Sequence, residues 1–137
     1  MKIHNYQLEK FIVFLHSLEL ERKASRMRTR FKNLLLQQLQ VITTEVLAID
    51  KEYYRYDENS QPIIENNTYQ FKDIEARNQD VLELTNEFFI IEQSEVNKEM
   101  LLSIKDSVLN HSPSTFKGDE ADIFDGICEL VEQINYE

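Results

Sequence analysis

FKNLLLQQLQVITTEVLAIDKEY, residues 31–53, carries a large apolar side chain at every third or fourth position. These positions are Phe31, Leu35, Leu39, Ile42, Val46, Ile49 and Tyr53. Because residues at this spacing share one face of an α-helix, the pattern predicts an amphipathic helix. YDENSQP, residues 56–62, supplies turn-forming residues and a proline that end it. We therefore predict one long helix over residues 22–54.

Helical spacing also appears on both sides of this segment. A first, shorter helix is predicted by Leu8, Phe11, Ile12, Leu15 and Leu18. A third helix is expected over residues 72–87, antiparallel to the long one, from the positions Ile74, Val81, Leu84 and Phe88. Between them, PIIENNTYQF places Asn66 and Asn67 between two β-prone runs. Since Asn tolerates positive φ, a β-hairpin over residues 62–71 is an open alternative to a plain loop.

Two further short strands and two C-terminal helices complete the expected fold. MKIHN at residues 1–5 alternates apolar and polar side chains, and EFFIIE predicts a buried strand over residues 88–92 that pairs with MKI. Ser94 is the expected cap of a helix over residues 95–109, and Asp119 that of the last helix. Ile123, Ile127, Leu130, Val131 and Ile134 form the stripe of that last helix. We expect a mainly α, α+β protein, a long helical hairpin with two or three short strands, in a single domain of residues 1–137.

Composition narrows the classes of function. Cys128 is the only cysteine, which excludes an intrachain disulfide, and no apolar run approaches the roughly 20 residues of a membrane span. Gly118 and Gly126 are the only glycines, too few for a P-loop or a dinucleotide fingerprint. The histidines His4, His16 and His111 are dispersed. We expect a soluble, cytoplasmic, non-enzymatic protein with no catalytic residue, no metal, no cofactor and no membrane association.

Charge is distributed unevenly along the chain, whose formal net charge is −10. Six cations crowd residues 22–32, namely Arg22, Lys23, Arg26, Arg28, Arg30 and Lys32. Four carboxylates, Asp122, Asp125, Glu129 and Glu132, follow helical spacing near the C-terminus. We favour intrachain ion pairs between the cations and acids such as this row. The alternatives are an acidic protein partner and, less favoured in so anionic a chain, nucleic acid.

Two smaller groups of residues have competing interpretations. Tyr53, Tyr54, Tyr56 and Tyr69 cluster near the end of the long helix and the predicted hairpin. Tyrosines are enriched in interfaces, so the cluster is either a binding surface or a cap over the core. Cys128 lies between Phe124 and Val131 at helical spacing, which favours a packed thiol over a nucleophile.

Four stretches carry a resemblance to a known family: MKIHNYQL, SRMRTRFKNLL, NKEMLLSIKDSVLN and CELVEQINYE, which begin at residues 1, 25, 97 and 128. They resemble an uncharacterised family of small proteins encoded by tailed phages and prophages of Gram-positive bacteria, near tail and lysis genes. The family has no established catalytic residues, so none is carried over here. SRMRTRF, residues 25–31, is its shared motif of unknown purpose.

The resemblance implies a phage protein that acts by protein–protein interaction in the host cytoplasm or on the virion. A tail-associated or assembly accessory factor, bound to a phage structural protein, is the first expectation. The alternative is an inhibitor of a host defence or host machinery complex, and the third is nucleic-acid binding through residues 22–32. The apolar stripe of the long helix is also long enough for a homodimer seam.

Overall fold

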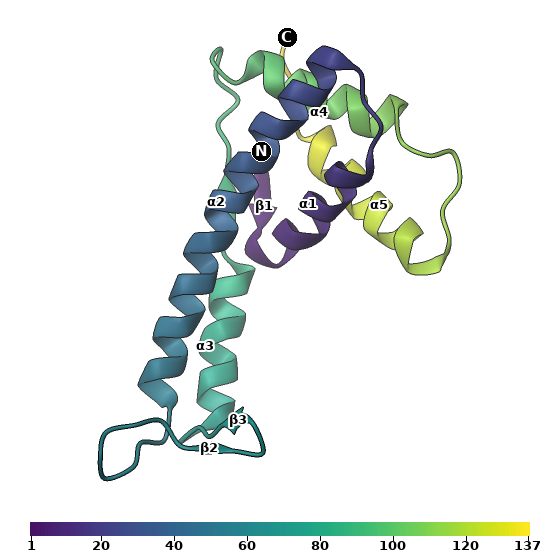
Figure 1. Ribbon diagram of the computed structural model, residues 1–137. Coiled ribbons are helices and arrows are strands. Elements are labelled where there is room, and N and C mark those ends of the chain that lie inside the picture. Colours follow the sequence, from purple (N-terminus) through teal and green to yellow (C-terminus); the bar gives the residue numbers. More distant parts are fainter.

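The longest element of the computed structural model, which describes residues 1–137, is the helix α2, Arg22–Tyr53 (Figure 1). The other helices are α1 (Leu8–Ser17), α3 (Ile74–Asn86), α4 (Lys98–Asn110) and α5 (Gly118–Glu132). The strands are β1 (Lys2–His4), β2 (Ile64–Glu65), β3 (Thr68–Tyr69) and β4 (Phe88–Ile90), and a 3-10 turn, η1 (Asn5–Gln7), precedes α1. The mainly helical α+β architecture predicted from the sequence is confirmed.

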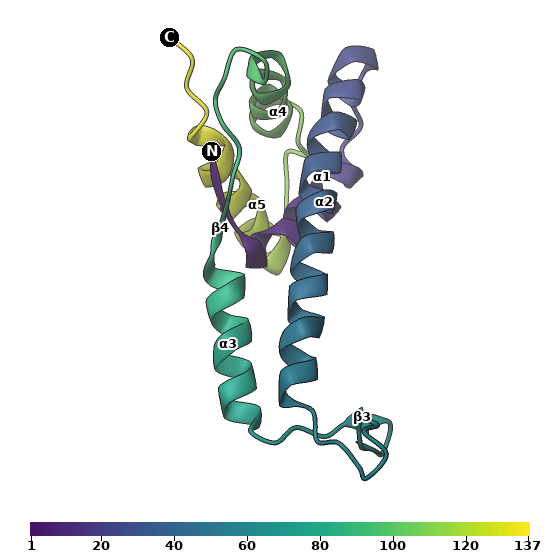
Figure 2. The same cartoon turned by 90° about the vertical axis from the view of Figure 1, so that its left-hand side faces the viewer.

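The molecule has two parts, which we call the head and the stalk (Figures 1 and 2). The head consists of residues 1–35 and 88–137, and the stalk consists of α2 from Leu36 onward together with α3. Every one of the 19 residues of the hydrophobic core belongs to the head, and none lies between Leu35 and Ile91. Because α2 meets α1 and α4 in the head but only α3 in the stalk, one continuous apolar stripe serves two environments.

The strands β1 and β4 pair with each other, as predicted, and they do so in antiparallel orientation with Ile3 opposite Phe89. Ile3 and Ile91 face the core, whereas the side chains of Phe88 and Ile90 are 50% and 59% exposed. The prediction of a buried strand over residues 88–92 was wrong in this respect. Only one face of this two-stranded ribbon packs against the core. Because successive side chains of a strand point to opposite faces, only every second residue is buried, even where four bulky residues follow one another.

The two predicted C-terminal caps were also wrong. α4 begins at Lys98, after a turn in which the Ser94 hydroxyl accepts a hydrogen bond from the Asn97 amide (3.3 Å). α5 begins at Gly118 with Lys117 as its cap, so Asp119 falls in the first turn. Both helices are stabilised by core packing of their apolar faces, which sets their bounds more strongly than a single capping side chain does.

The far end of the stalk is closed by residues 54–73, which we call the tip (Figure 1). β2 and β3 form the hairpin that the sequence suggested, and its two turn residues, Asn66 and Asn67, have φ of 52° and 62°. Two central residues with positive φ are the mark of a tight hairpin turn that matches strand twist. The tip thus joins two helices over a short distance. Even α2, the longest helix, is not apolar enough along its length to cross a membrane.

Adjacent leucines test whether stability resides in the head. Leu35 is fully buried and Leu36 is 44% exposed on the same turn of α2. We expect Leu35→Ala to lower the free energy of unfolding by about 2–5 kcal/mol, because it leaves a cavity in the core. The matched Leu36→Ala change should stay within about 0.5 kcal/mol. Urea denaturation followed by circular dichroism measures both values, and equal losses would contradict the assignment of the core.

Candidate protein-interaction site

Three arginines four residues apart form an exposed positive surface on the head half of α2. Arg22, Arg26 and Arg30, which we call the arginine face, are all exposed and none forms a salt bridge. The nearby carboxylate of Glu99 on α4 pairs with Lys23 instead. The hydrogen bond from Lys23 lowers the pKa of Glu99, and the more distant charges of Arg30 and Arg26 lower it further. The three side chains of the arginine face therefore form no ion pair within the chain.

Arg28, by contrast, turns toward the core and has a structural role. Its Nη1 donates to the backbone carbonyl of Leu15 (3.1 Å) and to that of Leu18, and its Nη2 donates to the Ser25 hydroxyl (3.4 Å). The two carbonyls lie at the C-terminal end of α1, where the Leu15 carbonyl also accepts from the Leu18 amide (3.3 Å) but the Leu18 carbonyl has no backbone donor. The Arg28 guanidinium bonds both carbonyls at once and ties α1 to α2. Lys32 contacts His16 of α1 (Nζ to Nδ1, 2.9 Å).

The intrachain pairing favoured from the sequence is thus wrong for most of the six cations. The carboxylates of the C-terminal row, Asp122, Asp125, Glu129 and Glu132, are exposed on α5 and form no salt bridge. The reason is topological, because α5 packs on α4 and α1 rather than along α2. The arginine face and the carboxylate row of α5 therefore lie on different helices of the head, an arrangement that the sequence alone did not predict.

One partly buried ion pair was missed by the sequence analysis. Arg77 of α3 donates from Nε to Asp50 Oδ1 of α2 (2.7 Å), and its guanidinium also lies over the Phe71 ring (5.3 Å). Because both side chains are largely shielded from water, this pair joins the helices of the stalk. The sequence does indicate that Arg77 faces the neighbouring helix. Arg77 stands three residues after Ile74 and four before Val81, within the predicted apolar stripe.

The tyrosine cluster fastens the tip to the stalk. Tyr54 is buried and stacks on Tyr69, with ring centroids 4.6 Å apart, and it also contacts Phe71. The Tyr53 hydroxyl donates to Asp80 of α3 (2.7 Å), which raises the pKa of Tyr53, and the Tyr56 hydroxyl donates to the Lys51 carbonyl (2.6 Å). The cluster therefore caps the end of the helical hairpin, while Tyr56 and Tyr69 keep exposed edges.

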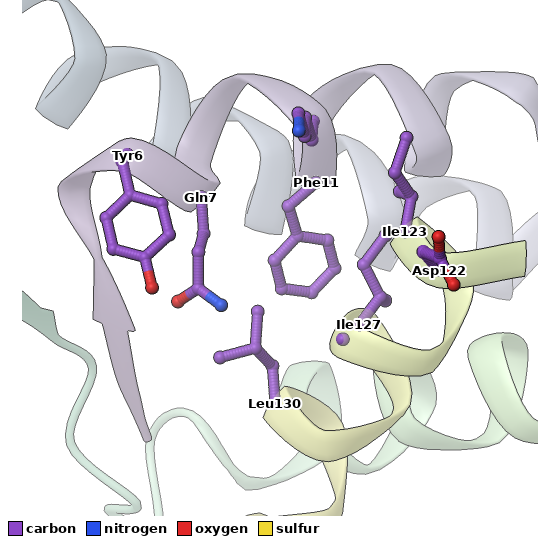
Figure 3. Close-up of a pocket in the computed structure, with 9 residues that line it drawn as sticks. Tyr6, Gln7, Phe11, Asp122, Ile123, Ile127 and Leu130 are labelled. Atoms are coloured by element: carbon purple, nitrogen blue, oxygen red, sulfur yellow. The ribbon is translucent and has the colours of Figure 1, made fainter. Parts of the chain in front are cut away.

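A small hollow lies between the start of α1 and α5 (Figure 3). Its volume is about 220 Å³, and Phe11 and Ile127 form part of its apolar lining. Asp122 of the carboxylate row stands at its edge (Figure 3). Gly126 also lines the hollow, and a methyl group added to this glycine would meet no other atom within 4 Å. Gly126 lies inside the predicted last helix and has no side chain, and it is the one feature of the sequence that could have indicated this hollow.

The remaining groups with chemical potential are scattered. His4 stacks on Phe88 (4.1 Å) and His111 lies 3.2 Å from Asp106, while His16 is engaged with Lys32. No three His, Cys, Asp or Glu side chains are grouped as a metal ion would require. Cys128 is half-buried and packs against the core, where burial and then the charges of Glu132 and Asp125 raise the pKa of its thiol.

Comparison with known proteins yields no match, either to a protein-family model, to a curated protein or to a solved structure.

The contrast between Arg28 and Arg30 gives a direct test of this geometry. Arg28→Ala should lower the free energy of unfolding by about 1–3 kcal/mol, because it leaves the Leu18 carbonyl without a hydrogen-bond donor. Arg30→Ala, two residues further along the same helix, should change it by no more than about 0.5 kcal/mol. Chemical denaturation of both variants supplies the measurement. A larger loss for Arg30→Ala would show that the arginine face has internal partners after all.

Reactivity of Cys128 reports on its surroundings. Because the raised pKa of the Cys128 thiol reduces the thiolate fraction at pH 8, and because the side chain is half-buried, we expect iodoacetamide to alkylate the folded protein more slowly than the urea-unfolded chain. Mass spectrometry of timed samples measures both rates. Similar rates in the two states would mean that Cys128 is an accessible and ordinary thiol.

Proposed function

We propose that this chain is a non-enzymatic phage protein that acts by binding another protein through its arginine face. The observation that carries the proposal is the lack of any internal carboxylate partner for Arg22, Arg26 and Arg30 in a chain of net charge −10. Guanidinium groups bind carboxylates through paired hydrogen bonds. An acidic surface can approach this face, whereas the acidic remainder of the molecule repels it, so charge also orients the encounter.

A tail-associated or assembly accessory role, in the host cytoplasm or on the virion, is the specific form of this proposal. It rests on the resemblance of four stretches to small phage proteins, and the shared SRMRTRF segment contains both Arg26 and Arg30. The structure divides that motif into two tasks, since Arg28 holds α1 while Arg26 and Arg30 stay exposed. A motif with one structural and two exposed arginines suits a contact with a phage structural protein.

Inhibition of a host defence or host machinery complex is the second candidate. Its support is the unpaired carboxylate row of α5, which presents four negative charges along one helix where a target could expect phosphates. Nucleic-acid binding through residues 22–32 is less well supported, because only the three residues of the arginine face are exposed and unengaged.

Charge reversal at the arginine face tests the proposal. Tagged protein is recovered from cells that produce phage particles, and its partners are quantified by mass spectrometry. We expect wild-type protein to retain tail subunits and Arg26→Glu/Arg30→Glu to lose them by at least about tenfold, since attraction becomes repulsion. Lys51→Glu/Arg55→Glu, an equal charge change at two exposed cations of the stalk and tip, is the matched control and should bind normally.

Other outcomes would redirect the assignment. Recovery of a nuclease or immune complex, lost on charge reversal in the α5 row, favours the inhibitor. Recovery of nucleic acid with an affinity that falls steeply with salt favours the third candidate. Absence of the protein from purified virions, together with normal tails in a deletion phage, would overturn the tail-associated role.

A further inference from the structure

The two edges of the β1–β4 ribbon differ in their backbone hydrogen bonding. Met1 pairs with Ile91 through two backbone bonds of 2.9 Å, and the Asn5 amide donates to the Glu87 carbonyl (2.9 Å). Hydrogen-bonded and non-hydrogen-bonded pairs alternate along antiparallel strands. The intervening pairs Lys2 with Ile90 and His4 with Phe88 therefore direct their backbone groups outward, away from the partner strand.

The outer edge of β1 is closed by glutamine side chains. Gln133 Oε1 accepts from the Lys2 amide (2.9 Å), and Gln133 Nε2 donates to the Lys2 carbonyl (3.0 Å). Gln7 Oε1 accepts from the His4 amide (2.9 Å). A side-chain amide thus takes the place of a neighbouring strand, which protects an edge that would otherwise be open to another chain.

The outer edge of β4 has no such cover. No side chain or loop bonds the backbone amides and carbonyls of Phe88 and Ile90, and their side chains are half-exposed. Lys2 lies over the Phe88 ring (5.6 Å) on the same outward face of the ribbon. Figure 2 shows β4 at the margin of the molecule, between α3 and the segment that leads to α4. Each of the two residues offers one donor and one acceptor to an incoming strand.

We propose that the β4 edge binds an extended segment of a partner protein as a third strand. The edge supplies main-chain hydrogen bonds, and Phe88 and Ile90 supply apolar contact for alternate side chains. Glu87 and Glu92, both exposed, flank the strand, so the segment has Lys or Arg at its ends. A second copy of this chain is disfavoured because edge pairing would bring these acids together in two molecules of net charge −10.

This inference rests on the proposed role as a protein-binding protein, but it concerns a surface other than the arginine face. A peptide with that chemistry, amidated Lys-Val-Thr-Val-Thr-Val-Lys, is the probe, and the same peptide with Glu at both ends is its control. Nuclear magnetic resonance measures the shift and the hydrogen exchange of the Phe88 and Ile90 amides. We expect the Lys-ended peptide to slow exchange at both amides and to bind about tenfold more tightly than the Glu-ended one at low salt.

Ile90→Pro removes one edge amide without touching the β1–β4 bonds, since the Ile90 amide points outward. We expect at least a tenfold loss of peptide binding with an unchanged melting temperature. Ile90→Thr, which keeps the amide, should retain more of the affinity and guards against misfolding of the proline variant. Arg26→Glu/Arg30→Glu should bind the peptide like wild type, so that failure at the β4 edge is distinguishable from failure of the arginine face.

Three results would overturn the proposal. The first is the absence of protection by either peptide. The second is equal binding of the Lys-ended and Glu-ended peptides. The third is protection of the Phe88 and Ile90 amides that rises with protein concentration alone, because a second copy would then be the occupant.

Discussion

The packing of the first half of α2 against α1 and α4 is the constraint on which the rest of the structure depends. Phe31 and Leu35 are fully buried there, and the ring of Phe31 meets that of Phe11, with centroids 5.4 Å apart. Arg28 adds a polar tie one turn earlier by satisfying carbonyls at the end of α1. Apolar burial stabilises this packing and the Arg28 guanidinium links the end of α1 to α2, so α2 is held in place inside the head.

The stalk follows from that direction rather than from a core of its own. Beyond Leu35, only Ile42 of α2 and Leu84 of α3 are buried before Tyr54 closes the tip. Helix formation propagates from a nucleus, so a segment anchored in the head extends into a region with little packing. Specific polar contacts then hold the two helices together, with Arg77 on Asp50 and Tyr53 on Asp80. The geometry of the stalk depends on these few contacts.

Local periodicity predicted the helices and the paired strands well, because repeats of three and four residues or of two report directly on the backbone. Ion pairing between side chains of distant segments was not predictable, which is why the arginines were assigned to acids on α5. The position of each arginine relative to the apolar stripe separates the arginines that have structural partners from those that do not. Arg28 precedes Phe31 by three residues and Leu35 by seven, so it lies in the apolar stripe, as Arg77 does in α3. Charges inside a stripe have structural partners here, and Arg26 and Arg30, outside it, do not.

The N-terminal end of the arginine face does not stabilise the helix α2. Arg22 and Lys23 occupy the first turn of α2, where no acid is present. Cations there oppose the helix dipole and cost roughly 0.3–1 kcal/mol each at low salt. Exposed ion pairs stabilise a fold too little to offset this cost. Moreover, Arg22, Arg26 and Arg30 form no ion pair. Arg22 disfavours the folded state where it stands, and we propose that a contact made after folding accounts for it. Under the proposed function, the carboxylates of a partner protein supply that contact.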